Sequence, residues 1–241
     1  MPIGVRDGAI SDAAQPMTDA NPCAASAGDT IYVDSVLGSD DAAHGGGAGD
    51  CAVATIDYAI SVASAEIRLA AGTYSRTETP IELSTGQSLV CEAGAVISGQ
   101  GLNVSYNITI DLRNHDTSVA GCTITGAGLG GYCIDIQNQN LNNDNAIHTN
   151  SLSDNVISQC GGAAVRVAGL VDLELSGNTI TASRASTPAL FFQSSGSATI
   201  DNNTFVDGNW GIHCNQAGVQ SGSGNTGTPC NLTACGTCPG Y

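Results

Sequence analysis

Short runs of alternating apolar and polar residues recur along most of the chain. Six of them are apolar-x-apolar triplets that begin 22 to 31 residues apart, at Ile81, Ile110, Ile134, Val165, Leu190 and Ile212. A second register of apolar positions runs in step with the first, through Ile97, Ile124, Ile157, Ile180 and Phe205. Two or three short strands per repeat predict a coil of stacked parallel strands, each with one buried face and the middle residue of its triplet exposed.

A recurring asparagine supports the coil. Asn155, Asn178 and Asn203 each stand two residues before a member of the second register. Asparagine suits a left-handed turn position, and its amides can stack as a ladder along the coil. An antiparallel sandwich would not keep two registers in step over five repeats, so we expect parallel stacking.

The two ends of the chain follow other patterns. Residues 1–22 carry no periodicity and predict a flexible tether, and Thr30–Val33 reads as a first strand. Apolar residues then recur at helical spacing after Thr55, a residue suited to an N-cap, which predicts a short helix over 56–65. We therefore expect a coil over 23–218, closed by this helix at its start and by residues 219–241 at its end.

This pattern resembles the right-handed parallel β-helix superfamily, the fold of pectate lyases and of many exported bacterial proteins. The start of the chain is similar to an uncharacterised domain that opens many such proteins, at Tyr32, Val33, Gly38, Ser39, Asp40, Thr55, Ile56, Gly72, Thr73 and Tyr74. The resemblance implies an all-β fold: a single right-handed parallel β-helix solenoid of about seven rungs, with a short N-terminal capping helix and a disulfide-rich C-terminal cap.

The charge of the chain limits the classes of partner that it can bind. The 241 residues include 22 Asp and Glu against six Arg and no Lys, which gives a net charge of −16. Nucleic acids and anionic membranes require basic patches, so neither is expected as a partner. No run of 18 apolar residues predicts a transmembrane helix. We expect a monomer.

Ten cysteines indicate an oxidising compartment, so we expect a secreted or cell-surface protein, bacterial and extracellular. Cys23 and Cys51 bracket the first strand, and two further pairs, Cys91 with Cys122 and Cys133 with Cys160, are about one rung apart. The remaining four, Cys214, Cys230, Cys235 and Cys238, cluster at the end. Because exported proteins favour disulfides, we expect these four cysteines to form disulfides, with a zinc site as the alternative.

The middle residues of the triplets form one column on the outside of the coil: Glu82, Asp111, Asp135, Arg166, Phe191 and His213. Neighbours in such a column lie about 4.8 Å apart, so the three carboxylates repel one another unless a cation or a raised pKa compensates, or insertions move them apart. Calcium suits them, because it accepts several carboxylate oxygens. The cofactor expectation is therefore none or Ca²⁺. Asp40 and Asp41, in a glycine-rich loop, are candidates for a second calcium site.

The resemblance also implies a catalytic alternative. Polysaccharide lyases of this fold place calcium ligands and a basic residue on one outer sheet, which corresponds to Asp111 and Asp135 as ligands and Arg166 as the base. The structural alternative is an Asp135–Arg166 pair on the surface.

Rings and amides lie beside this column. Tyr132, Gln137, Gln193, Trp210 and Asn215 occupy neighbouring positions on successive rungs, close to Phe191 and His213. Aromatic rings stack on sugar rings and amides bond to hydroxyls, so this set is a candidate ligand-binding face. The polar insertion 138–150 is predicted to rise beside it as a loop that sets specificity.

Three functions remain open. The preferred one is an exported non-catalytic surface or binding protein that contacts polysaccharide or another protein through its outer sheet. A coil of about seven rungs is short for the enzymes that this chain resembles, which favours this function. The first alternative is a calcium-dependent polysaccharide lyase or related carbohydrate-active enzyme. The second is an ice-binding or structural fibre subunit, suggested by small outward residues such as Thr179 and Thr181 beside the second register.

Overall fold

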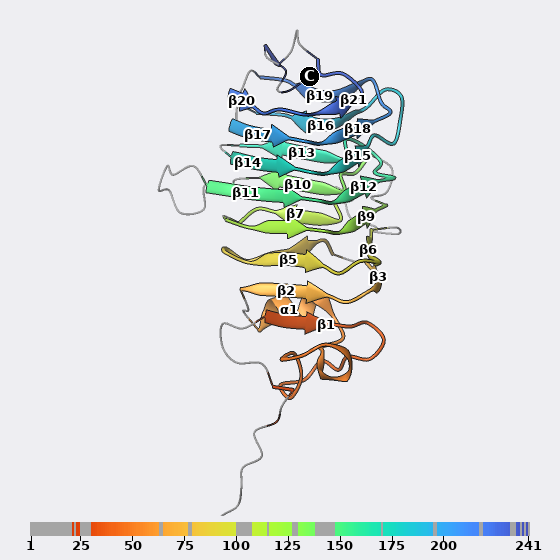
Figure 1. Cartoon of the computed structure of the whole chain (residues 1–241), viewed down its shortest axis with the longest axis vertical. Helices are drawn as coiled ribbons and strands as arrows, with labels where there is room; N and C mark the ends of the chain where they lie inside the picture. Colours follow the sequence, from red (N-terminus) through yellow and green to blue (C-terminus); the bar gives the residue numbers. More distant parts are fainter. Residues whose placement is uncertain are drawn as a thin grey trace, which may run out of the picture.

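The chain folds as one coil of parallel strands in a computed structural model (Figure 1). The structure describes residues 21, 23–24, 30–62, 65–76, 79–99, 108–114, 116–126, 130–137, 148–169, 171–194, 197–216, 219–231, 235–236, 238 and 240. Apart from Asn21, the predicted tether lies outside these residues, as does most of the predicted 138–150 loop.

Three sheets run along the coil, and every strand pair in them is parallel. The eight-stranded sheet holds β1 (Thr30–Val33), β2 (Glu66–Leu69), β5 (Ser88–Cys91), β8 (Ser118–Ala120), β11 (His148–Ser153), β14 (Val171–Ser176), β17 (Ser197–Asp201) and β20 (Val219–Ser221). The seven-stranded sheet holds β3 (Gly72–Ser75), β6 (Ala95–Ser98), β9 (Thr123–Thr125), β12 (Val156–Ser158), β15 (Thr179–Thr181), β18 (Thr204–Val206) and β21 (Thr226–Gly227). The six-stranded sheet holds β4 (Ile81–Glu82), β7 (Ile110–Leu112), β10 (Ile134–Gln137), β13 (Val165–Ala168), β16 (Pro188–Phe192) and β19 (Trp210–Cys214).

Each full turn contributes one strand to each sheet, so the expected parallel solenoid is confirmed. In the described part of the chain, the six-stranded sheet limits the turns with all three strands to six, slightly fewer than the predicted seven. The difference arises at the two ends, where β1, β20 and β21 belong to incomplete turns.

Both apolar registers are confirmed as the core. Ile134 pairs with Val165, and the column continues through Leu190 and Ile212, all fully buried. The second register pairs Ile97 with Ile124 and runs on to Phe205 in the same way. Each buried side chain of this size contributes about 1.5–3 kcal/mol to folding, so the stacked columns hold the coil together.

The asparagine ladder is also confirmed. The backbone N–H and the side-chain amide of Asn155 both donate to Oδ1 of Asn178, at 2.9 and 3.0 Å. Asn178 bonds to Asn203 in the same manner, and Asn203 to Asn225. The prediction that these residues take the left-handed turn is wrong.

The left-handed position is one residue earlier, at Asp154, Gly177, Asn202 and Gly224. The preceding residue makes the sharp corner, so each asparagine is turned inward, where its amide is buried and bonds along the coil axis.

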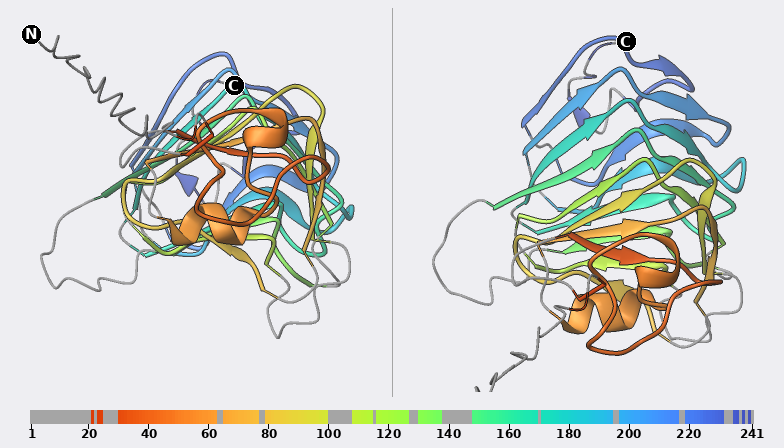
Figure 2. Two further views of the ribbon diagram at one scale, coloured as in Figure 1. Left: turned by 90° about the horizontal axis from the view of Figure 1, so that it is seen from below. Right: turned by 60° about the horizontal axis from the view of Figure 1, so that its bottom comes forward.

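The N-terminal helix exists but is shorter than predicted. α1 spans Ile56–Ser61 instead of 56–65, with Thr55 as its N-cap, whose hydroxyl accepts from the Tyr58 N–H at 3.2 Å. The helix ends early because the chain must reach β2, which starts at Glu66 and pairs with β1. Seen from below, α1 lies across the N-terminal end of the coil (Figure 2). A 3₁₀ turn, η1 (Gly49–Cys51), precedes it.

The other end is covered by the last residues. β20 and β21, from within the segment expected to be a cap, extend two of the sheets. Beyond them, the Gly211 N–H donates to Pro229 O and the Asn231 N–H to Ile212 O, both at 2.8 Å, so this segment covers the outer edge of β19.

All ten cysteines form disulfides: Cys23–Cys51, Cys91–Cys122, Cys133–Cys160, Cys214–Cys235 and Cys230–Cys238. The predicted disulfides are therefore confirmed. The zinc alternative for the last four is wrong, because their sulfur atoms are bonded to one another and no thiolate remains.

Candidate functional site

The predicted outer column stands in register on the six-stranded sheet. Glu82 pairs with Asp111, Asp111 with Asp135 and Asp135 with Arg166. The column then continues through Phe191 to His213. The alternation that places one side of each strand in the core also places these six residues on one outer face.

A buried ion pair lies at the centre of this face. Nε of Arg166 donates to Oδ1 of Asp135 at 2.7 Å, and a second guanidinium nitrogen contacts Oδ2. Asp135 is fully buried and the Arg166 side chain is 14% exposed, so this is no surface pair. Both oxygens of this carboxylate bond to side chains of the same sheet face, Gln137 and Arg166.

Three predicted ligand-binding residues surround this pair. Gln137 Nε2 donates to Asp135 Oδ2 at 2.6 Å, and Arg166 Nη1 donates to Gln193 Oε1 at 3.1 Å. The Arg166 guanidinium lies 4.6 Å from the centre of the Tyr132 ring, a cation–π contact. These polar groups thus bond mainly to one another.

Arg166 is held in its charged form. Burial acts to lower its pKa, but the hydrogen bond and the charge of Asp135 raise the pKa above the ordinary value of 12.5. A guanidinium that stays protonated cannot accept a proton as a general base. The role of Arg166 as the base of a lyase stays a prediction, and its ion pair with Asp135 opposes proton uptake by the guanidinium.

Asp111, one rung below Asp135, is also fully buried. Arg113 Nε donates to its Oδ2 at 2.6 Å, while Oδ1 has no hydrogen-bond partner in the described structure. Burial raises the pKa of Asp111 to about 6, with smaller upward contributions from Asp135 and Glu82 and a downward one from Arg113. The stacked carboxylates are thus compensated by a raised pKa at Asp111 and by an arginine beside each of the two buried acids.

The three acids predicted as calcium ligands stand on neighbouring rungs, but within the described structure they do not form a metal-binding group. Glu82 is exposed, and the described residues contain no group of three or more His, Cys, Asp or Glu side chains that could hold a metal ion.

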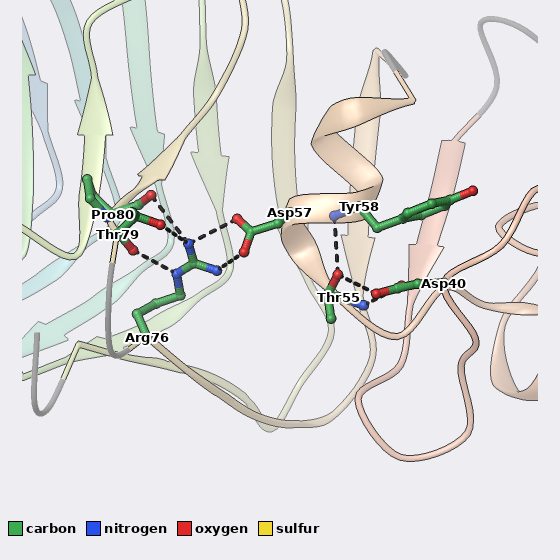
Figure 3. A network of polar contacts seen from close by, with 7 residues as sticks. All are labelled: Asp40, Thr55, Asp57, Tyr58, Arg76, Thr79 and Pro80. Atoms are coloured by element: carbon green, nitrogen blue, oxygen red, sulfur yellow. Dashed lines mark hydrogen bonds and ion pairs between the residues drawn. The ribbon is translucent and has the colours of Figure 1, made fainter.

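The acidic loop near the N-terminus uses its carboxylates to order the backbone. Asp40 accepts from the Ala54 N–H at 2.8 Å. It also accepts from the N–H and the hydroxyl of Thr55, at 2.9 and 2.7 Å (Figure 3). Asp41 accepts from the Ala43 N–H and contacts His44 Nδ1 at 2.6 Å, which lowers the pKa of Asp41. The two carboxylates therefore serve separate parts of the loop.

A hollow of about 300 Å³ lies beside α1 and is lined by Thr55, Asp57, Tyr74, Arg76 and Thr79 among others. Arg76 forms a two-point ion pair with Asp57, at 2.7 and 2.9 Å, and its other donors bond to Thr79 and Pro80 (Figure 3). Because these donors already have acceptors, we interpret the residues around the hollow as the contact that holds α1 to the first turn of the coil.

A second hollow, of about 210 Å³, lies at the C-terminal end of the six-stranded sheet. Phe191 and His213 line it and stack on one another, with ring centres 5.8 Å apart and an interplanar angle of 26°. Asn215 contributes a third predicted residue, and the lining is completed by Ser186, Pro188 and Asn209. Half-buried Trp210 pairs with Pro188 one rung away but does not line the hollow.

Sequence reasoning missed Ser186, Pro188 and Asn209. Pro188 and Trp210 both stand two residues before a core residue of the triplet register, Leu190 and Ile212. The equivalence of Pro188 and Trp210 could therefore have been predicted by counting back two residues from each of these core residues. Ser186 and Asn209 lie in turns of different length, and no periodic signal marks them.

The seven-stranded sheet presents the predicted column of small residues. Thr73, Val96, Thr123, Val156, Thr179, Thr204 and Thr226 stand in register on its outer face. Valine interrupts the threonines twice, and the Val156 side chain is 46% exposed. The ice-binding alternative stays a prediction.

None of the helices among the described residues is long and apolar enough to cross a bilayer. The family model described as periplasmic copper-binding protein (NosD) matches residues 82–226, more than half of the chain. No curated protein and no solved structure gives a significant match. The match begins after the N-terminal segment, so the resemblance of residues 30–74 to an opening domain stays a prediction. The matched range spans most of the coil, and the chain belongs to the NosD family of periplasmic copper-binding proteins, whose fold is the right-handed parallel β-helix.

Proposed function

We propose that this NosD-family protein is an exported, non-catalytic binding protein that contacts a polysaccharide through its six-stranded sheet. Export is supported by the periplasmic family and by the five disulfides, which persist in oxidising compartments.

One observation carries the proposal: rings and amides gather on the outer face of a single sheet. Phe191 and His213 stack at one end of it, and the Tyr132 ring lies under Arg166 at its centre. Gln193 and Asn215, one rung apart in the same column position, are both exposed. Sugars are recognised by this combination of apolar ring faces and hydrogen-bonding amides.

The charged groups on the outer face of the six-stranded sheet favour a binding function over a catalytic one. Asp135 and Arg166 neutralise one another, and Asp111 is paired with Arg113. Acid–base catalysis requires a group that can exchange a proton with the substrate. Arg166 is committed to its ion pair instead, which favours a structural role for the centre of the face.

Copper belongs to the family description, but the described residues do not fit it. Copper sites in proteins are built mainly around imidazole, thiolate or thioether ligands. All cysteines are in disulfides, and the two histidines with described side chains, His44 and His213, lie at opposite ends of the coil. We derive no function for this chain from copper.

The test is electrophoresis of the folded protein through gels that contain one soluble polysaccharide each. We expect at least one polysaccharide to retard the protein, and expect the Phe191→Ala variant to lose the retardation. Thr179→Ala, on the seven-stranded sheet, is the matched control and should migrate like the unmodified protein. Unretarded migration through every gel, with capture of a protein partner that Phe191→Ala abolishes, would assign the face to protein binding instead.

A further inference from the structure

The hollow at the C-terminal end of the six-stranded sheet has an uncharged lining. Its walls are Phe191, His213 and Pro188, and its polar groups come from Ser186, Asn209 and Asn215. We infer that it is a subsite for the ring of an uncharged sugar. This inference rests on the proposed function and adds the class of ligand and the place where one ring is held.

The size of the hollow fits a small ligand. Its volume is about 210 Å³, below the roughly 300–1,000 Å³ of pockets that enclose drug-sized ligands. A single ring can enter it, while the rest of a polysaccharide chain must lie along the open face of the sheet.

The polar groups suit hydroxyls. Asn209 and Asn215 are exposed, and each offers an amide donor and acceptor. The Asn231 amide nitrogen lies 2.9 Å from His213 Nδ1. The direction of this hydrogen bond depends on the tautomer of the His213 ring. Neutral donors and acceptors can bond to sugar hydroxyls without desolvating a charge.

The charges nearby disfavour an anionic ligand. Arg166, one rung below Phe191, is ion-paired with Asp135 and bonded to Gln193. The net charge of −16 repels polyanions over the whole surface. Among the described residues, the exposed Arg184 is the arginine next to the lining in sequence, two residues before Ser186. The exposed Asp207, of opposite charge, stands two residues before Asn209.

The experiment compares neutral and acidic polysaccharides by isothermal titration of the full-length protein. The neutral probes are dextran, galactomannan and soluble β-glucan, and the acidic probes are polygalacturonate and alginate. We expect binding to a neutral probe, weakened about tenfold or more by Phe191→Ala, as expected for the loss of ring stacking and ring burial. Asn215→Ala should weaken it too, and Arg184→Gln should leave it unchanged.

The outcomes separate the inference from the proposed function. Binding to acidic probes only, lost in Arg184→Gln, would overturn the neutral subsite and leave the polysaccharide function standing. Neutral binding that survives both Phe191→Ala and Asn215→Ala would place the subsite elsewhere and also overturn the inference. No heat with any probe would contradict the proposed function itself. Circular dichroism of each variant checks that the coil is intact, and Thr179→Ala serves as the folded control.

Discussion

At the scale of single residues, two carboxylates on an outer sheet face are fully buried. Asp135 is neutralised by Arg166, whereas Asp111 keeps one oxygen without a hydrogen-bond partner in the described structure. The same β-strand geometry thus produces two different environments one rung apart. Their energetic consequences differ and can be measured separately.

Removing the carboxylate of Asp135 should destabilise the fold strongly. Asp135→Ala leaves the guanidinium of Arg166 buried without its counter-charge, and breaking such a pair costs about 3–5 kcal/mol. Urea unfolding at pH 7 measures this loss. Glu174→Gln, an exposed carboxylate on the eight-stranded sheet, should change stability by less than about 0.5 kcal/mol. Equal effects from the two substitutions would show that the buried pair is not formed.

Asp111 should make stability depend on pH in a defined window. Its pKa is raised from 3.8 to about 6 in the folded state, so the folded protein binds the proton more tightly than the unfolded chain does. The free energy of unfolding should therefore fall as pH rises from about 4 to 6, by about 2–3 kcal/mol, and then level off.

Asp111→Asn tests this dependence, because the amide cannot titrate. Urea unfolding between pH 4 and 7 should lose this part of its slope in Asp111→Asn and retain it in Glu174→Gln. A slope that persists in Asp111→Asn would assign the dependence to another group.

At the scale of the element, the asparagine ladder holds successive turns at the same corner. Each side chain bonds both to its counterpart on the next rung and to a backbone carbonyl, as Asn178 does with Leu152 O at 2.9 Å. The ladder satisfies backbone N–H groups at corners where the strands end and their ladder bonds stop.

Asn178→Ala should cost about 2–4 kcal/mol. It leaves the buried N–H of Asn155 without an acceptor, and each such group costs about 1–3 kcal/mol. Thermal and urea unfolding measure the change, with the adjacent Thr179→Ala as the control on the outer face. If the two variants unfold alike, the amide ladder contributes little to stability.

At the scale of the whole molecule, each turn contacts only its neighbours, so the two ends are stabilised independently. α1 and its loop cover one end, tied by Cys23–Cys51. Residues 229–231 and two disulfides cover β19 at the other. An uncovered edge strand would invite pairing with other chains.

Opening the C-terminal cap should therefore have a local effect. In Cys214→Ser/Cys235→Ser, hydrogen exchange should increase at β16 and β19, while β2 and β5 keep their protection. Loss of stability should be about 2–5 kcal/mol. The matched variant Cys23→Ser/Cys51→Ser should show the reverse distribution. A uniform increase over the coil in either variant would contradict independent ends.

The alternation and spacing of apolar residues determined the coil, both core registers and the order of the outer column. These features follow from the sequence because every rung must bury the same side of each strand. A one-residue slip in register would expose the core side chains. Cysteine spacing pointed to three of the five disulfides for the same reason. Helix length was not determined, because the end of α1 depends on where β2 must start.

Tertiary structure alone decided what the outer column does. Sequence places Asp111, Asp135 and Arg166 on one face, but only the folded arrangement buries both carboxylates and pairs each with an arginine. The hollow beside Phe191 and His213 likewise depends on turns of unequal length that bring Ser186 and Asn209 to it. Strand periodicity carries no information about such turns, so the site, unlike the coil, emerges only when the chain is folded.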